Sequence, residues 1–477
     1  MPADANAAPP KLYAAREPIF PKRVSGWFRT LKWRLMILTL GIYYLTPWIR
    51  WDRGPELPDQ AVLVDLAGRR FFFFWIEIWP HEFYFVAGLL IMAGLGLFLF
   101  TSALGRVWCG YACPQTVWTD LFILVERWVE GDRNARIRLL KQKYDLRKLR
   151  LRLTKWTLWL LIGIATGGAW VFYFADAPTL AVDLATGQAH VIAYSSIALL
   201  TATTFVFGGF MREQICIYAC PWPRIQAAMM DEQTLTVAYR EWRGEPRGKH
   251  IKADGAATLG DCVDCNACVA VCPTGVDIRK GQQLACITCA LCIDACDDIM
   301  HKLGRERGLI DYLSLADEKR EQAGGHAVPA WKRIFRPRVL IYTAAWSAVG
   351  LGLLFALFIR SEVDLTVAAI RNPVNVTLSD GSVRNAYDLR VRNKQGEAAE
   401  FRVSIVTEEP LRLAIEGTDE RRVSVAADET GHARAYVIAQ PSGPAATGGR
   451  SPLRFWIEDV ETGARASADV SFVGKGE

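Results

Sequence analysis

The sequence predicts a multi-domain membrane protein made of a bundle of five transmembrane α-helices, a small α+β insert before the fifth helix, and a C-terminal immunoglobulin-like β-sandwich. Three observations predict this fold class. Hydrophobic residues make up 51% of the 477 residues and 17 residues are tryptophan, a composition unusual for a soluble protein. Several long stretches carry no Asp, Glu, Lys or Arg. The C-terminal part instead alternates apolar and polar residues between turn signals.

Five uncharged stretches are the candidate spans. A helix needs roughly 20 residues to cross the ~30 Å hydrocarbon layer, and only the first stretch is shorter. Arg34 and Arg50 can extend to the interfaces at its ends, where tryptophans also lie, so we expect it to span; the alternative is a buried core helix. The stretches are residues 35–49, 83–105, 156–175, 191–211 and 339–359.

The distribution of Lys and Arg predicts the orientation. Residues 106–155 are rich in both, whereas residues 176–190 contain neither, so the first loop is expected in the cytoplasm and the second outside. This predicts a multi-pass protein of the bacterial inner membrane without a cleavable signal peptide. The expected parts are a cytoplasmic tail 1–34, a four-helix domain 35–211, a cytoplasmic segment 212–338, a fifth helix 339–359 and a periplasmic sandwich 361–477.

The basic residues predict a membrane surface as the partner. Residues 134–155 have the pattern of a basic amphipathic helix on the inner surface, with a plain solvated linker helix as the alternative. The net charge of +6 is explained by the orientation and by the anionic inner leaflet. Basic motifs interleaved with aromatic residues are absent from the sequence, so we expect the lipid bilayer and no nucleic acid as a partner.

The residues from Val363 onward predict short β-strands. Alternating segments separated by Gly, Asp and Asn turns are typical of an immunoglobulin-like sandwich. This part has no cysteine, so its core must hold by packing without an inter-sheet disulfide. The clearest strands are 386–391, 401–406, 422–426, 433–438, 453–457 and 468–472.

The twelve cysteines are confined to one part of the chain. All lie between Cys109 and Cys296, on or next to the predicted cytoplasmic face, which favours metal or redox chemistry over a disulfide framework. The strongest motif is a doubled run, C-x2-C-x2-C-x3-C, in which Pro273 follows the first run and Asp297 the second. Its members are Cys262, Cys265, Cys268 and Cys272, then Cys286, Cys289, Cys292 and Cys296.

This spacing is that of bacterial ferredoxins, in which three close thiolates hold one [4Fe-4S] cluster and the fourth reaches the other. We therefore expect a 2[4Fe-4S] ferredoxin-like domain at about residues 255–305. Zinc, which also accepts four thiolates, is the alternative. The crossed pattern assigns Cys262, Cys265, Cys268 and Cys296 to the first cluster, and Cys272, Cys286, Cys289 and Cys292 to the second.

Two further cysteine pairs follow an internal repeat. Cys109-Gly-Tyr-Ala-Cys113-Pro follows the second span, and Cys216-Ile-Tyr-Ala-Cys220-Pro follows the fourth, which would bring both pairs to one membrane level. If the helix runs through each motif, cysteines at i and i+4 share one face and suit a soft ion such as copper. If the proline instead opens a new helix, the second cysteine is a cap-like residue. Packing is the alternative to a redox or copper site.

The histidines give only weak candidates for a cofactor or metal site. The interiors of the predicted spans contain none, so a haem with two histidine ligands within the membrane is not expected. His81 and His190 precede the second and fourth spans, where they could mark a metal or quinol site; interfacial histidines without such a role are the alternative.

With these motifs the chain resembles the FixG/CcoG family of membrane polyferredoxins, accessory proteins for assembly of cbb-type cytochrome c oxidase. The resemblance covers the paired Cys-Pro motifs, the doubled ferredoxin run, the fifth span and a sandwich tail containing residues 375–385. The first four spans and the ferredoxin segment are similar also to quinol-dehydrogenase-like membrane subunits of periplasmic nitrate reduction, which are not expected to carry the tail. Membership implies reduction of Cu(II) to Cu(I) for the copper site of the oxidase.

Three hypotheses follow. The leading one is a cupric reductase: electrons pass from a cytoplasmic donor through two [4Fe-4S] clusters to copper at Cys109, Cys113, Cys216 and Cys220. Its implied partners are copper ions or copper chaperones and the assembly factors of the oxidase. The second is an electron conduit linked to a quinol. The third is a non-enzymatic assembly scaffold whose clusters sense redox state.

Overall fold

The computed structural model describes residues 18–54, 57–248, 259–360, 363–395, 397–417, 420–427 and 429–476, without the side chains of His81, Ala330 and Ile334. Residues 1–17 of the predicted tail and 255–258 of the predicted ferredoxin-like segment lie outside the described residues. Contacts divide the chain into two units, Met1–Ile49 with Gln60–Leu351 and Arg50–Asp59 with Gly352–Glu477. Each unit is described by itself.

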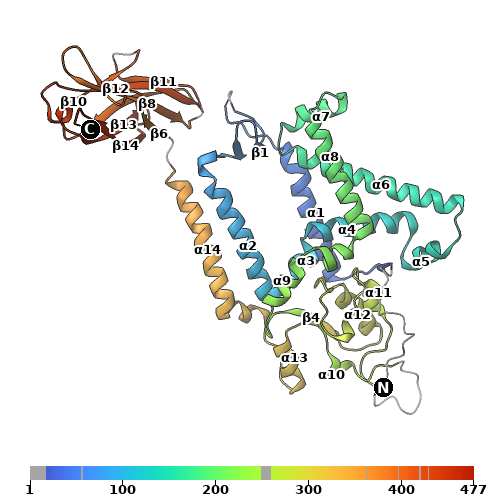
Figure 1. Cartoon of the computed structure of the whole chain (residues 1–477). Helices are drawn as coiled ribbons and strands as arrows, with labels where there is room; N and C mark the ends of the chain where they lie inside the picture. Colours follow the sequence, from blue (N-terminus) through green and yellow to red (C-terminus); the bar gives the residue numbers. More distant parts are fainter. Residues whose placement is uncertain are drawn as a thin grey trace, which may run out of the picture. The chain divides into compact units, whose positions relative to one another are not determined.

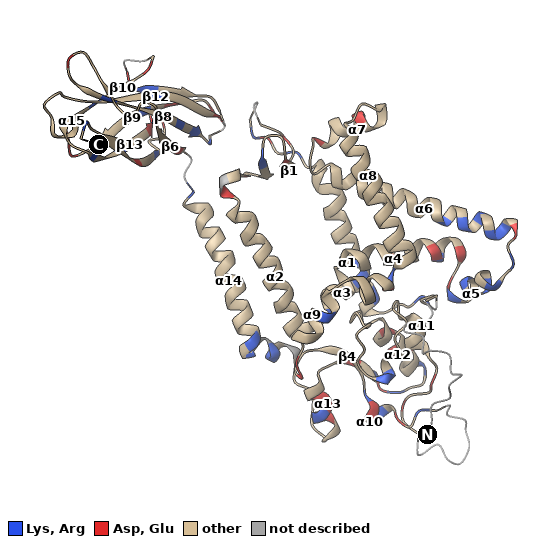
Figure 2. Cartoon of the chain, in the orientation of Figure 1, with Lys and Arg blue, Asp and Glu red and all other residues tan. Residues whose placement is uncertain are grey.

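Within the described part of the chain, three helices are long and apolar enough to cross a membrane: α2 (Tyr84–Leu104), the helix Val191–Met211, and α14 (Pro337–Phe358). The second of these begins as α8 (Val191–Thr204) and ends in the π-helical turns of η3 (Phe205–Met211). Figure 2 shows that α2, α8 and most of α14 carry almost no charged residues. These three correspond to the second, fourth and fifth predicted spans.

The prediction of five such helices is wrong by this criterion. The first stretch forms α1 (Trp27–Leu45), whose N-terminal half contains Arg29, Lys32 and Arg34. The third forms part of α6 (Leu146–Val171), a single 26-residue helix whose first half is strongly basic. Both helices exist, but each is longer than its uncharged stretch because the helix continues into the basic residues beside it.

The basic segment 134–155 is not one amphipathic surface helix. It forms α5 (Arg133–Lys141) and the start of α6, separated by a short non-helical link. Several of its cations are buried against acids of α4 (Pro114–Glu130): Lys155 Nζ lies 2.8 Å from Glu130 Oε1, and Arg136 pairs with Glu126. Glu126 also lies 2.6 Å from Nη2 of Arg212, at the end of η3. These ion pairs join four helical elements, because a buried charge is tolerated only beside a partner.

Smaller elements complete the first unit. Strands β1 (Val62–Asp65), β2 (Arg70–Phe73) and β3 (Ile76–Ile78) form an antiparallel sheet before α2. Strands β4 (Thr236–Tyr239) and β5 (Ile310–Leu313) pair antiparallel and flank the cysteine-rich segment, which contains α11 (Ala267–Val271) and α12 (Leu291–Lys302). The remaining short helices are η1 (Thr46–Trp48), η2 (Pro80–Glu82), α7 (Ala177–Thr186), α10 (Glu241–Gly244), η6 (Ile278–Lys280), α13 (Leu315–Gln322) and η7 (Ala330–Phe335).

The second unit contains a β-sandwich (Figure 1). One sheet has the strand order β10-β12-β8-β6, with β7 also paired to β8, and the other has the order β11-β9-β13-β14. Inward side chains such as Tyr387, Phe401 and Phe455 are fully buried and form one core. The strands are β6 (Val363–Ala369), β7 (Val376–Thr377), β8 (Val383–Asn393), β9 (Ala399–Val406), β10 (Leu411–Ile415), β11 (Arg422–Val425), β12 (Thr430–Ala439), β13 (Arg450–Asp459) and β14 (Arg465–Val473), with α15 (Pro444–Thr447) between β12 and β13.

The six predicted strands fall on β8, β9, β11, β12, β13 and β14; one runs past its strand by one residue, at Ala426, and the observed strands begin up to three residues before the predicted ones. The sequence analysis missed β6, β7 and β10. Strand β7 is only two residues long. Strands β6 and β10 lie at the edges of their sheet.

The N-terminus of α1 is joined to the cysteine-rich segment by one carboxylate. Asp294, on α12, accepts hydrogen bonds from the backbone N–H groups of Phe28 at 3.2 Å and Arg29 at 2.7 Å. These N–H groups lie in the first turn of α1, where no intrahelical acceptor is available. Asp294 therefore caps the N-terminus of α1, although it lies far away in the sequence.

We predict that Asp294→Ala weakens this junction. Loss of a capping carboxylate costs about 1–2 kcal/mol, so hydrogen–deuterium exchange of the first turn of α1 should accelerate by about tenfold. Asp298→Ala is the matched control, because Asp298 lies on the same helix in an exposed ion pair with Lys302, and such pairs contribute little. Equal exchange in both variants would contradict the capping role.

Candidate functional site

The two Cys-x3-Cys-Pro motifs have the same local structure. In the first, Cys109 lies in the short helix α3 (Val107–Tyr111), the helix ends, and Pro114 opens α4 with Cys113 as its N-cap residue. In the second, Cys216 lies in the π-helix η4 (Ile215–Ala219), Cys220 is extended, and α9 (Trp222–Met229) begins after Pro221. The proline thus starts a new helix in both copies. Of the two alternatives that the sequence leaves open, the structure shows the second, in which the proline opens a new helix and the two cysteines of a motif do not share one helix face.

The four thiols of the two motifs nevertheless lie near one another; we call Cys109, Cys113, Cys216 and Cys220 the thiol quartet. Burial raises the pKa of the Cys216 thiol to about 12, and the nearby Cys113, Cys109 and Cys220 add to the rise. Burial likewise raises the pKa of Cys109 and of Cys113, each with Cys220 close enough to contribute. The repeat therefore brings its two cysteine pairs together, and burial favours the protonated thiol at Cys109, Cys113 and Cys216.

The two copies differ by one residue. Two residues separate Arg106 from Cys109, whereas three separate Arg212 from Cys216. The π-helical turns η3 and η4 lie on either side of Arg212. A π-turn holds one residue more than an α-turn, and such turns are frequent at functional sites. The extra residue is accommodated there, and Cys216 still reaches the quartet.

The eight cysteines of the doubled run form two groups of four. Cys272, Cys286, Cys289 and Cys292 line one small cavity. Cys262, Cys265, Cys268 and Cys296 line another, together with Arg279. This is the crossed grouping that the spacing predicts, and all eight are free of disulfides. Their role as ligands stays a prediction.

The backbone at both cavities suits a bound cluster. The residues on either side of the middle cysteine have left-handed conformations in both runs: Asp264 (φ 51°) and Asn266 (φ 54°) around Cys265, Thr288 (φ 58°) and Ala290 (φ 59°) around Cys289. Such conformations are costly for residues other than glycine. Both loops adopt this unfavourable conformation at the same two positions of the motif. The resulting bend turns each loop around its cavity.

Without a metal, the buried thiols of both groups are neutral. Burial raises the pKa of Cys268 to about 11, of Cys296 to about 12 and of Cys289 to about 12. A buried thiolate without a cation is unfavourable, whereas iron stabilises the thiolate form. Four soft sulfur donors around each cavity therefore fit a [4Fe-4S] cluster.

The thiol quartet lies directly against the second group of four cysteines. Cys109 packs in one apolar cluster with Ile287 and Cys289, and the Tyr111 hydroxyl donates to the carbonyl of Cys289 at 3.2 Å. A Cβ atom added at Gly110 would lie 2.6 Å from the carbonyl oxygen of Ile287 and 3.1 Å from Cα of Cys289. Backbone touches backbone here, so glycine is required.

Two more contacts define this interface. Arg106, nearly fully buried, donates from Nη1 to the carbonyl of Cys286 at 2.8 Å and also to that of Leu284. Its guanidinium opposes the rise in the pKa of Cys109. On the other side, Cys216 lines a small cavity with Pro273, the residue after Cys272. The quartet thus lies beside two segments that carry ligands of the same predicted cluster.

Other candidates contribute less. Among the described residues, no group of three or more His, Cys, Asp or Glu side chains is arranged to hold a single metal ion, and this includes the thiol quartet as it stands in the structure. His190 is the N-cap of α8, where its Nδ1 accepts a hydrogen bond from the N–H of Ile192 at 3.3 Å. The side chain of His81 lies outside what the structure describes.

Sequence reasoning missed three residues of this site. Gly110 contacts the cysteine-rich loop, Arg106 bonds that loop, and Gln226 accepts a hydrogen bond from Cys109 Sγ at 3.2 Å. A signal for the first was present: the repeat has Gly110 in one copy and Ile217 at the matching place in the other. No sequence signal marks Gln226, because its role depends on the packing of α9.

Long apolar helices, a domain with two four-cysteine groups and an immunoglobulin-like sandwich define a membrane-bound iron–sulfur oxidoreductase. Comparisons with known families agree. Residues 211–315 match the 4Fe-4S dicluster domain, residues 85–131 match a 4Fe-4S binding domain, and residues 353–475 match the IG-like fold at the C-terminus of FixG.

Similar proteins give the family. The chain is 69% identical to "Protein RdxB" of Cereibacter sphaeroides over 98% of both chains. It is 57% identical to "Nitrogen fixation protein FixG" of Rhizobium meliloti, over 90% of this chain and 84% of that protein. A crystal structure of a FixG-related protein from Vibrio parahaemolyticus aligns with 24% of this chain at 17% identity, covers 99% of its own length and has a TM-score of 0.22. The chain belongs to the FixG family.

We predict that Gly110→Ala displaces the loop that carries Cys286 and Cys289. Overpacking of this kind costs about 1–3 kcal/mol, so iron and acid-labile sulfide per chain should fall and exchange of the loop amides should accelerate. Gly41→Ala in α1 is the control, because a Cβ atom there meets nothing within 4 Å. Full iron content with an unchanged loop in Gly110→Ala would show that the contact is not needed.

Proposed function

We propose that this chain is a cupric reductase of the bacterial inner membrane that supplies Cu(I) for assembly of cbb-type cytochrome c oxidase. In this proposal the ferredoxin-like domain lies on the cytoplasmic side, where a donor loads it, and the sandwich lies in the periplasm. The substrate is Cu(II) at the thiol quartet. Copper chaperones and the assembly factors of the oxidase receive the product.

One observation carries the proposal: the backbone contact between Gly110 and the loop of Ile287 and Cys289. It puts a group of soft sulfur ligands next to a domain built for one-electron chemistry. A [4Fe-4S] cluster, when bound, accepts and gives up single electrons. Each Cu(II) takes up one electron and becomes Cu(I), and no covalent bond of the protein is made or broken.

The residues of the chain have separate parts in this scheme. The quartet thiols bind copper, because thiolates favour Cu(I) over harder ions. Gly110 and Tyr111 hold the quartet against the loop of Cys289, and Arg106 holds the segment of Leu284 and Cys286. These contacts keep the path short between the place where an electron is stored and the place where it is used.

We predict that purified protein reduced with dithionite turns over Cu(II) anaerobically, and that Cys216→Ser or Cys220→Ser lowers the rate by about tenfold, because a hydroxyl is a poor ligand for Cu(I). Ile217→Val is the matched control within the same motif. Iron content should be equal in all variants. Unchanged turnover in both serine variants would refute the site.

We also predict that copper binding depends steeply on pH. Because burial raises the pKa of Cys216 to about 12 and also raises that of Cys109 and Cys113, copper must displace protons at neutral pH. Cu(I) affinity should rise by about tenfold per pH unit for each proton displaced. Competition with a chromophoric Cu(I) chelator between pH 6.5 and 8 measures this slope, and Cys216→Ser should reduce it. A flat profile would contradict binding by these thiols.

A further inference from the structure

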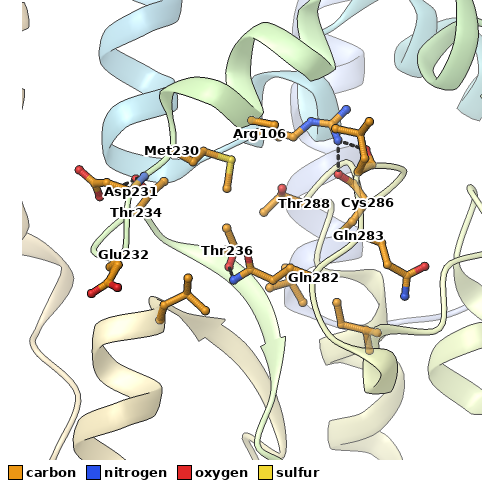
Figure 3. A pocket seen from close by; sticks show the side chains of 15 residues that line it. Arg106, Met230, Asp231, Glu232, Thr234, Thr236, Gln282, Gln283, Cys286 and Thr288 are labelled. Carbon is orange, nitrogen blue, oxygen red and sulfur yellow. Dashed lines mark hydrogen bonds between the residues drawn. The ribbon is translucent and has the colours of Figure 1, made fainter.

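A cavity of about 500 Å³ opens beside Cys286 (Figure 3). Its lining comes from Arg106 between α2 and α3, from the end of α9, from strand β4 and from the loop that leads to Cys286. Buried side chains form its floor, and more exposed ones, including Leu284 and Leu315, form its rim. The floor residues are Arg106, Thr234, Thr236, Val237, Ile278 and Thr288.

The walls combine apolar surface with a few polar groups. Met230, Val237 and Ile278 supply apolar contacts. Opposite them, the Gln282 amide donates from Nε2 to Thr236 Oγ1 at 2.6 Å, and both side chains retain further hydrogen-bonding capacity. This size and make-up are typical of sites for small organic molecules.

The charges of the cavity select the class of ligand. A nucleotide cofactor needs a cation for its phosphates. Among the described lining residues the one cation is Arg106, whose Nη1 atom already bonds two carbonyls. The nearby Arg336 and Lys319 are likewise engaged, since they pair with Asp231 and Glu232 on the cavity wall. The amide and hydroxyl groups instead suit a neutral ring that carries carbonyl or hydroxyl oxygens.

The cavity also lies where a membrane-soluble molecule can arrive. Arg106 is two residues beyond the end of α2, and Arg336, directly before α14, bonds the carbonyl of Ser102 in α2. Arg336 also pairs with Asp231 on the cavity wall. Two apolar helices therefore end at the level of this cavity, and apolar leucines form part of its rim.

We propose that this cavity binds the head group of a membrane quinol, which is the electron donor of the ferredoxin-like domain. The quinol loses two O–H hydrogens as two protons and two electrons and leaves as the quinone. The two four-cysteine groups would hold two [4Fe-4S] clusters, each able to accept one of the two electrons, and the two protons would be released to water. This goes beyond the proposed function, since binding at the cavity requires no copper.

Binding of short-chain quinones to the full-length protein in detergent tests the proposal. Decylubiquinone and a short-chain menaquinone serve as probes, so the experiment distinguishes benzoquinone from naphthoquinone. We expect saturable binding of at least one, and an azido derivative of it should cross-link to residues 227–237 or 282–288. Binding of FMN or NADH there in place of quinones, or cross-linking elsewhere, would overturn the proposal.

Two neighbouring alanines of α9 give a matched pair of variants. Ala227 lines the cavity and Ala228 does not, although both are exposed. Ala227→Trp should weaken quinone binding by about tenfold or more, because the indole fills space that the ring needs, whereas Ala228→Trp should leave it unchanged. Equal affinities in the two variants would overturn the site.

A further variant tests the site without the risk that a bulky side chain disturbs the fold. Gln282→Leu removes a hydrogen-bonding group without adding bulk and should weaken binding by about fivefold. Ala227→Trp and Gln282→Leu should both retain the iron content of the unaltered protein. Since this readout is binding alone, a protein that reduces copper normally from dithionite and yet fails to bind quinones would sink this inference and leave the proposed function intact.

Discussion

The arrangement of the site depends on one close approach between two backbones. At Gly110 the helix α3 comes so near to Ile287 and Cys289 that even a methyl group would collide with the loop. Tyr111 and Arg106 add hydrogen bonds on either side of that point. Side chains elsewhere can repack around a change, but two peptide backbones in contact have little freedom to move. The position of the thiol quartet relative to the cysteine-rich loops is therefore set by the absence of a side chain.

Features that depend on residues close together in the sequence could be predicted. The doubled cysteine run and its crossed grouping follow from short intervals between residues, as do three apolar helices and six strands of the sandwich. The sequence does not decide whether a helix breaks at Pro114 and Pro221, because a proline can either end a helix or open the next one. The contact of Gly110 with Ile287 and the cap that Asp294 gives to α1 could not be predicted, since each joins residues far apart in the sequence.

The positions of charged residues in the sequence were the least reliable guide to which surfaces are exposed. The positively charged loop was interpreted as a surface facing anionic lipid, but Arg136 and Lys155 are almost fully buried beside Glu126 and Glu130. Composition cannot distinguish a cation facing water from one paired inside, because both appear as the same letter. The same difficulty affected α1 and α6, whose basic residues mark places where the helices extend past their uncharged stretches.

The unequal spacing of the two repeats has a structural consequence. A residue inserted into an ordinary α-helix rotates everything after it by about 100°, which would have turned Cys216 away from its three companions. Wider turns around Arg212 accommodate the insertion instead. The two halves are therefore not interchangeable: one copy has Gly110 against the iron–sulfur domain, and the other has Ile217 at the matching position. Both copies have the same Cys-x-Tyr-Ala-Cys-Pro text, while the backbone around the first cysteine is α-helical in one and π-helical in the other.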